Sequence, residues 1–170
     1  GTASVDNVTV TPAPIKSTKV YPNSETDYSG STFDAKDSTS VTLTVSVTSD
    51  ESAGLTYIWC RSINDEWRWL TNPYITQGLT EKYTGADSQT LSITELPAGQ
   101  TFSYKVQIVT GDGYKCYSEP FTVSTCAHDG DKTLQHDETH HWYVCGKCGA
   151  EFDRAEHSGG TATCTAKAVC

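Results

Sequence analysis

Cysteine and histidine are concentrated near the C-terminal end of the chain. All five histidines and five of the seven cysteines lie between Cys126 and Cys170, which is only about a quarter of the 170 residues. Thiolate and imidazole are the side chains that zinc prefers, and a protein usually supplies four of them in a tetrahedron. This part of the chain is therefore the first candidate for a metal site.

The segment Cys145-Gly-Lys-Cys148-Gly149 has the form of a zinc knuckle. A Cys-x-x-Cys turn presents two thiolates from one tight loop, and glycine after the second cysteine tolerates a positive φ. The competing interpretation is a redox or structural disulfide between Cys145 and Cys148, with histidines that have nothing to do with a metal. We favour the metal site because so many other ligand types lie nearby.

Two further ligands must come from outside the knuckle. His141 precedes Cys145 by four residues and His157 follows Cys148 by nine, so both can fold back onto the knuckle. Cys126 and His128 are alternative ligands for the same positions. The spacing leaves open which of these residues complete the site.

We expect such a zinc ion to be structural. A catalytic zinc needs an open coordination position beside a general base, as in a His-Glu-x-x-His helix, and the sequence has no such motif. Four or more candidate ligands favour a closed site. Because the segment is too small to build a core of its own, bound Zn²⁺ would supply much of its folding free energy.

Two other groups of residues could carry chemistry. Trp67 and Trp69 share one face of a strand, with Tyr74 close by, so they could form an aromatic platform for sugar stacking, although core or cross-strand packing is the alternative. Cys60 and Cys116 could form a disulfide, which requires Cα atoms within about 7 Å, or remain two separate thiols.

Composition and charge exclude several classes of function. The formal net charge is −9, with 21 acidic and 12 basic residues, which repels phosphate backbones and argues against nucleic-acid partners. The sequence contains no run of about 18 apolar residues, so we predict no membrane insertion. The sequence also lacks a Gly-x-Ser-x-Gly motif and a phosphate-binding glycine loop, so we expect no enzyme activity.

The elements that must position these residues are β-strands. Apolar and hydroxyl residues alternate with period two, which predicts half-buried strands, and turn residues separate them every 8 to 12 residues or so. About seven strands and no convincing helix predict an all-β, immunoglobulin-like sandwich. The predicted strands are Val5–Val10, Val41–Val47, Leu55–Trp59, the hairpin Ser62–Trp67, Thr90–Thr94, Ser103–Val109 and Tyr114–Val123.

Within this pattern, Tyr57-Ile-Trp59 and the later Gly111-Asp-Gly113 hairpin resemble the immunoglobulin-like modules of bacterial surface proteins. The segment from Leu96 to Phe102 is similar to the corner of fibronectin type III domains, with phenylalanine where those usually carry tyrosine. The strand Leu55–Trp59 itself is expected to be central, with Trp59 pointing inward. If Tyr104-x-Val106 matches the Tyr-x-Cys of antibody domains, valine replaces the cysteine and no inter-sheet disulfide forms.

The C-terminal segment carries a second resemblance. His141-Trp142, the knuckle with its glycine, and His157 resemble the tandem Cys/His repeats found near the ends of large surface proteins of gut Firmicutes. After His157 the chain restarts toward Cys164 and Cys170, which would then belong to an incomplete second repeat and either pair or stay free. The resemblance implies an extracellular or cell-surface location.

Together these observations predict four segments: a lead-in at 1–37 with an N-terminal strand followed by an irregular connection or short edge strands, the sandwich at 38–124, the zinc segment at 125–158, and a truncated repeat at 159–170. We expect a monomeric, non-catalytic module of a longer multidomain surface protein, acting as a spacer or binding an unknown protein or glycan ligand. The alternatives are a carbohydrate-binding accessory domain of a glycan-active enzyme, favoured if Trp67 and Trp69 are exposed on one face, and a metal-dependent hydrolase with three protein ligands and a water.

Overall fold

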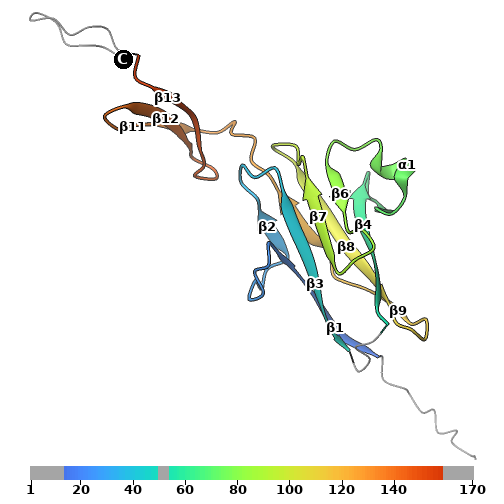
Figure 1. The fold of residues 1–170 in the computed structure, drawn as a ribbon. Coiled ribbons are helices and arrows are strands. Elements are labelled where there is room, and N and C mark those ends of the chain that lie inside the picture. The colour runs from blue at the N-terminus through green and yellow to red at the C-terminus, as the bar shows by residue number, and fades with distance from the viewer. Residues whose placement is uncertain (1–13, 50–53, 159–170) are drawn as a thin grey trace, which may run out of the picture.

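The computed structural model describes residues 14–49 and 54–158. Two β-sheets pack face to face, and a third, smaller sheet lies beyond one end of this sandwich (Figure 1). The all-β fold expected from the sequence, an immunoglobulin-like sandwich followed by a small C-terminal subdomain, is confirmed. The predicted strand Val5–Val10 and the segment with Cys164 and Cys170 lie outside the described residues.

In the two sheets of the sandwich, the spatial order of the strands differs from their order in the sequence. The first sheet contains β1 (Ile15–Pro22), β3 (Val41–Ser49), β7 (Thr90–Thr94) and β6 (Lys82–Thr84). The second contains β2 (Thr32–Asp34), β10 (Phe121–Ser124), β8 (Thr101–Val109), β4 (Thr56–Ile63) and β5 (Glu66–Trp69), and β9 (Lys115–Tyr117) also pairs with β8. The third contains β11 (Lys132–His136), β12 (His140–Cys145) and β13 (Glu151–Glu156).

The core of the sandwich follows the predicted alternation. In β3, Val41, Leu43 and Val45 are buried while the threonines between them are half-buried. In β8 every second side chain from Phe102 to Ile108 points inward. Successive side chains of a strand point to opposite faces, so each sheet contributes one apolar face to the core.

Trp59 lies at the centre of this core, as expected from the predicted strand Leu55–Trp59. It is fully buried, pairs across the strands with Val106, and its indole Nε1 donates a hydrogen bond to the carbonyl oxygen of Ser88 at 2.9 Å. A buried indole needs such a partner for its N–H. Val106 is thus the residue that faces the tryptophan across the strands.

The sandwich begins earlier than residue 38, so the predicted domain boundary is wrong. β1 is an eight-residue edge strand of the first sheet, and β2 is a short edge strand that pairs in parallel with β10. The helical turn α1 (Pro73–Thr76) was also not predicted; Asn72 caps it by accepting a hydrogen bond from the backbone N–H of Tyr74. In the described ranges, no helix has the length and apolar character needed to cross a membrane.

Candidate metal centre

The first pair of ligands lies on the segment that leaves β10 toward the small subdomain. Hydrogen bonds hold this segment against the end of the sandwich: the backbone N–H of Cys126 donates to Lys36 O at 2.8 Å, and that of Thr125 donates to Gln100 O at 2.9 Å. The Thr125 hydroxyl also donates to Pro97 O at 2.6 Å. Cys126 is therefore fixed to the sandwich by its neighbours before any metal binds.

Gly99 makes this contact sterically possible. A Cβ atom at this position would lie 2.6 Å from the Cβ of Ala127, and the φ of +70° also favours glycine. With glycine at position 99, the loop of the sandwich can approach the segment that carries Cys126 and His128 more closely than it could with any other residue there.

The second pair of ligands lies in the turn between β12 and β13. Cys145 ends β12, and Cys148 follows in a loop closed by a hydrogen bond of 2.8 Å from the backbone N–H of Gly149 to Cys145 O. Gly149 has a φ of +72°, as the knuckle pattern predicts. Gly146 N–H donates to Asp131 O at 2.8 Å and ties the loop to the start of the subdomain.

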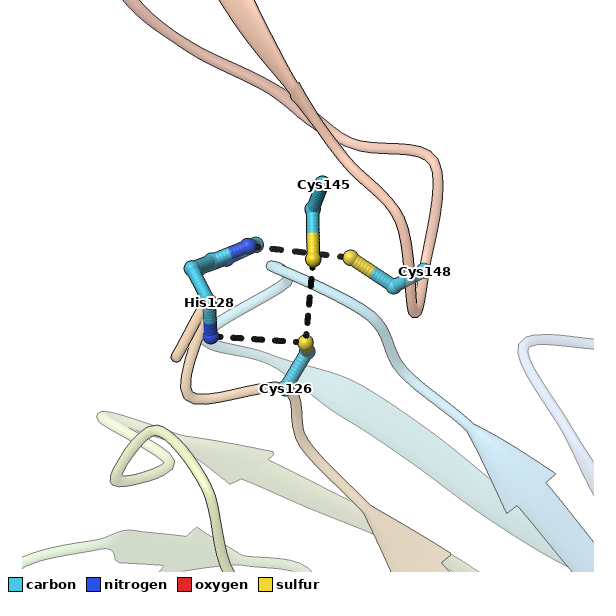
Figure 2. Close-up of side chains that lie close together, drawn as sticks. All are labelled: Cys126, His128, Cys145 and Cys148. Carbon is cyan, nitrogen blue, oxygen red and sulfur yellow. Dashed lines mark hydrogen bonds between the residues drawn. The ribbon is translucent and has the colours of Figure 1, made fainter. Parts of the chain in front are cut away.

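These two segments bring four donor atoms together. The ligand atoms of Cys126, His128, Cys145 and Cys148 all lie within 4.8 Å of one another (Figure 2). The Sγ atoms of Cys126 and Cys145 are 3.7 Å apart, and His128 Nδ1 lies 3.7 Å from Cys148 Sγ. Ligands at about 2.3 Å from a tetrahedral zinc would lie about 3.8 Å from one another. The four residues could therefore bind a metal ion.

The electrostatics of the cluster favour a bound cation. The backbone N–H of Cys148 donates to the Cys145 sulfur and lowers the pKa of that thiol to about 6. Burial, with two further sulfurs close by, raises the pKa of the Cys148 thiol to about 11. The Cys145 thiolate therefore forms readily, and its negative charge disfavours a second thiolate at Cys148. A divalent cation among the sulfurs would offset the repulsion between the two thiolates.

Aromatic packing orients the histidine ligand. The imidazole of His128 lies against the ring of Phe152 on β13, with ring centres 5.2 Å apart. Phe152 in turn stacks on Tyr143 of β12 at 6.0 Å. Residues that hold a ligating imidazole in one orientation tune a metal site, so Phe152 would position His128 for a bound metal ion, a role that the sequence alone did not indicate.

His141 and His157 lie outside this cluster, which corrects the prediction that they fold back onto the knuckle. His141 is the second residue of β12 and Cys145 its last, and four residues of a strand span about 13 Å. The two imidazoles instead stack on each other with ring centres 5.6 Å apart. They line an open hollow of about 490 Å³ together with Leu134, His136 and Tyr143. The run Trp142-Tyr-Val144 beside His141 favours a strand, and this signal could have indicated that His141 is carried away from the knuckle.

The thiols form no disulfide in the described ranges. Cys60, Cys116, Cys126, Cys145 and Cys148 are all free. Cys60 pairs with Lys105 on the outer face of the second sheet, whereas Cys116 pairs with Ile108 and packs against the core on the inner face. The sheet therefore separates Cys60 from Cys116, and of the two possibilities that the sequence left open, a disulfide or two separate thiols, the structure has the separate thiols.

Of the three residues considered for an aromatic platform, the two tryptophans share one exposed face and Tyr74 does not join them. Trp67 and Trp69 are 36% and 38% exposed on the same face of β5. Tyr74 lies on α1, outside the sheet. Two residues that the sequence did not indicate, Lys105 of β8 and Tyr117 of β9, contact the tryptophans instead.

The small subdomain has almost no buried apolar side chains. From residue 127 to 158 the buried residues are Cys145 and Cys148, two of the four candidate ligands. Every residue of β11 is exposed. The ligand cluster therefore occupies the place that a hydrophobic core would occupy in a larger domain.

No protein-family model matches the chain, and no curated protein matches it. We therefore infer the function from the geometry of the site and from the surfaces around it.

Proposed function

We propose that the chain is a non-catalytic module in which a structural Zn²⁺ ion fastens a three-stranded subdomain to the end of an immunoglobulin-like sandwich. The observation that carries this proposal is the origin of the four donor atoms, which lie within 4.8 Å of one another. Cys126 and His128 come from the segment bonded to the sandwich, and Cys145 and Cys148 come from the knuckle of the subdomain (Figure 2). One ion would thus connect both parts.

The donor set favours zinc. Three thiolates and one imidazole are soft to borderline ligands, which suit Zn²⁺ far better than Mg²⁺ or Ca²⁺. A hydrolase would require three protein ligands and a position left for water. Four converging ligands complete a tetrahedron without water, so the metal-dependent hydrolase is the less favoured alternative.

The lack of a core explains why a metal would be needed. A three-stranded sheet whose buried residues are Cys145 and Cys148 gains little free energy from apolar burial. Zinc binding to an unfolded chain contributes its binding free energy directly to folding. The subdomain would then be folded when zinc is bound and largely unfolded without it.

The wider role that we propose is that of a spacer or ligand-binding module in a longer extracellular protein at a bacterial surface, present as a monomeric unit of that chain. The resemblance of the sandwich and of the Cys/His segment to surface-protein modules supports this location. The net charge of −9 disfavours a nucleic-acid partner.

Metal analysis combined with thiol counting tests the proposed function. The chain, purified without chelators, should contain about one zinc per molecule, and Cys126, Cys145 and Cys148 should resist alkylation until a strong chelator is added. The double variant His141→Ala/His157→Ala is the matched control, because it removes two imidazoles outside the cluster and should retain the zinc. Metal-free protein with the same subdomain fold and freely alkylated thiols would contradict the proposal.

A further inference from the structure

Aromatic side chains gather on the outer face of the second sheet, away from the metal centre. Trp67 and Trp69 of β5 and Tyr117 of β9 are 36%, 38% and 47% exposed. The rings of Trp69 and Tyr117 lie 6.4 Å apart, although β4 and β8 separate their strands. Such a group of exposed aromatic rings leaves apolar surface in contact with solvent, which is typical of a binding surface.

Lys105 of β8 lies between these rings. Its ammonium nitrogen is 4.4 Å from the centre of the Trp67 ring and 4.6 Å from that of Tyr117, within the range of cation–π contacts. We call Trp67, Trp69, Lys105 and Tyr117 the aromatic face. Its cation rests on aromatic rings that are themselves open to solvent.

The strand register builds this arrangement. Trp69 pairs with Cys60, and Cys60 pairs with Lys105, so the three side chains follow one row across the sheet. Cys60, between the other two, is 2% exposed. Gln107, two residues beyond Lys105, pairs with Tyr117 and donates a hydrogen bond of 2.6 Å from its side-chain amide to the phenol oxygen. The phenol proton of Tyr117 therefore remains available for a ligand.

The charge of this face is opposite to that of the chain. At the outward positions of β4, β5, β8 and β9 there are two lysines, Lys105 and Lys115, and no carboxylate. The whole chain carries 21 acidic and 12 basic residues. A locally positive surface on an acidic protein attracts an anionic ligand to this face in preference to others.

We propose that the aromatic face binds a glycan that carries carboxylate groups, such as a uronic-acid polymer. The apolar C–H face of a pyranose ring stacks on exposed indole and phenol rings. The sugar carboxylate draws the Lys105 ammonium away from Trp67 and Tyr117, which frees these rings for stacking. A neutral glycan would have to displace the same cation without a charged partner for it.

An acidic peptide is the other anionic candidate, and it fits the face less well. It would pair with Lys105 but offers no flat C–H surface for Trp67 and Trp69. The inference goes beyond the proposed structural role of the metal and does not depend on it, because the aromatic face belongs to the sandwich and the metal ligands belong to the segments beyond β10.

Calorimetric titration of the metal-replete chain tests the inference with defined probes. The panel consists of oligogalacturonate, alginate and hyaluronan oligomers, the methyl-esterified oligogalacturonate as the neutral match, and poly-glutamate. We expect binding to at least one uronate, weakening as salt is added, and much weaker binding to the ester and to poly-glutamate. Lys105→Gln and Trp67→Ala should each weaken uronate binding by about tenfold or more.

Tyr74→Ala is the matched control, since Tyr74 is 86% exposed but lies on α1 outside the aromatic face. It should bind as the parent chain does, and so should Cys126→Ala, which separates this test from the metal proposal. Equal binding of the esterified glycan would overturn the role of the carboxylate. Equal binding of poly-glutamate, binding unaffected by Lys105→Gln, or no binding to any uronate would overturn the proposal itself.

Discussion

Replacing Cys126 by alanine removes the sulfur that the sandwich side contributes to the metal centre. The side chain is half-buried, and its sulfur lies 3.7 Å from that of Cys145. The backbone N–H of residue 126 would still donate to Lys36 O, so the segment should keep its place on the sandwich. His128, Cys145 and Cys148 would remain, with water completing the coordination.

The magnitude follows from the number of ligands. Structural zinc in small domains contributes about 10 to 16 kcal/mol of binding free energy at neutral pH. If the four ligands share this equally, the loss of one costs about 2.5 to 4 kcal/mol, which weakens the zinc Kd by about two to three orders of magnitude. Since the subdomain has no apolar core, its folding should weaken together with metal binding.

Competition against a chromophoric chelator measures the zinc Kd of Cys126→Ala and of the parent chain. The control is His141→Ala, because spacing allowed His141 as a ligand but it lies four residues along β12 from Cys145. We expect a large loss of affinity in the first variant and little change in the second. A Cys126→Ala chain that binds zinc within about threefold of the parent, or a His141→Ala chain that loses zinc as strongly, would refute the assignment of ligands.

Three further predictions concern the rest of the chain. Removal of zinc by a chelator should abolish the hydrogen-exchange protection of amides in β11–β13 but leave β3 and β8 protected, and a uniform change in all strands would count against a separate metal-dependent subdomain. Glu81→Ala should destabilise the metal-saturated sandwich by about 3 to 5 kcal/mol, measured by urea denaturation. Glu81 is 2% exposed, is paired with Arg61 and accepts a hydrogen bond of 2.7 Å from the Tyr83 hydroxyl, so its loss leaves Arg61 without its partner. A cost below about 1 kcal/mol would contradict this prediction. Gly99→Val should cost more than about 1 kcal/mol and weaken zinc binding, because its Cβ would clash with Ala127, whereas Gly111→Ala, with open space around it, should change neither.

The sequence by itself determined the strands and the presence of the knuckle. Alternation of apolar and hydroxyl residues is a local property, and it correctly identified β3, β7 and β8 and the burial of Trp59. The positive φ of Gly149 was likewise predictable, because a tight Cys-x-x-Cys turn requires it locally. The sequence left residues 11–37 open between an irregular connection and short edge strands, because this stretch contains three prolines and many polar residues. The structure has edge strands there, and β1 and β2 gain their stability from pairing with β3 and β10.

Only the tertiary structure decided which residues complete the site. Sequence spacing allowed His141, His157, Cys126 and His128 alike, but an extended β12 carries His141 away from the knuckle, while hydrogen bonds to the sandwich hold Cys126 beside it. The aromatic face was decided in the same way, because strand pairing across β4 and β8 places Lys105 and Tyr117 beside the tryptophans. Ligand types and turns are written in short stretches of sequence, whereas the meeting of distant side chains depends on strand register and on how the sheets pack.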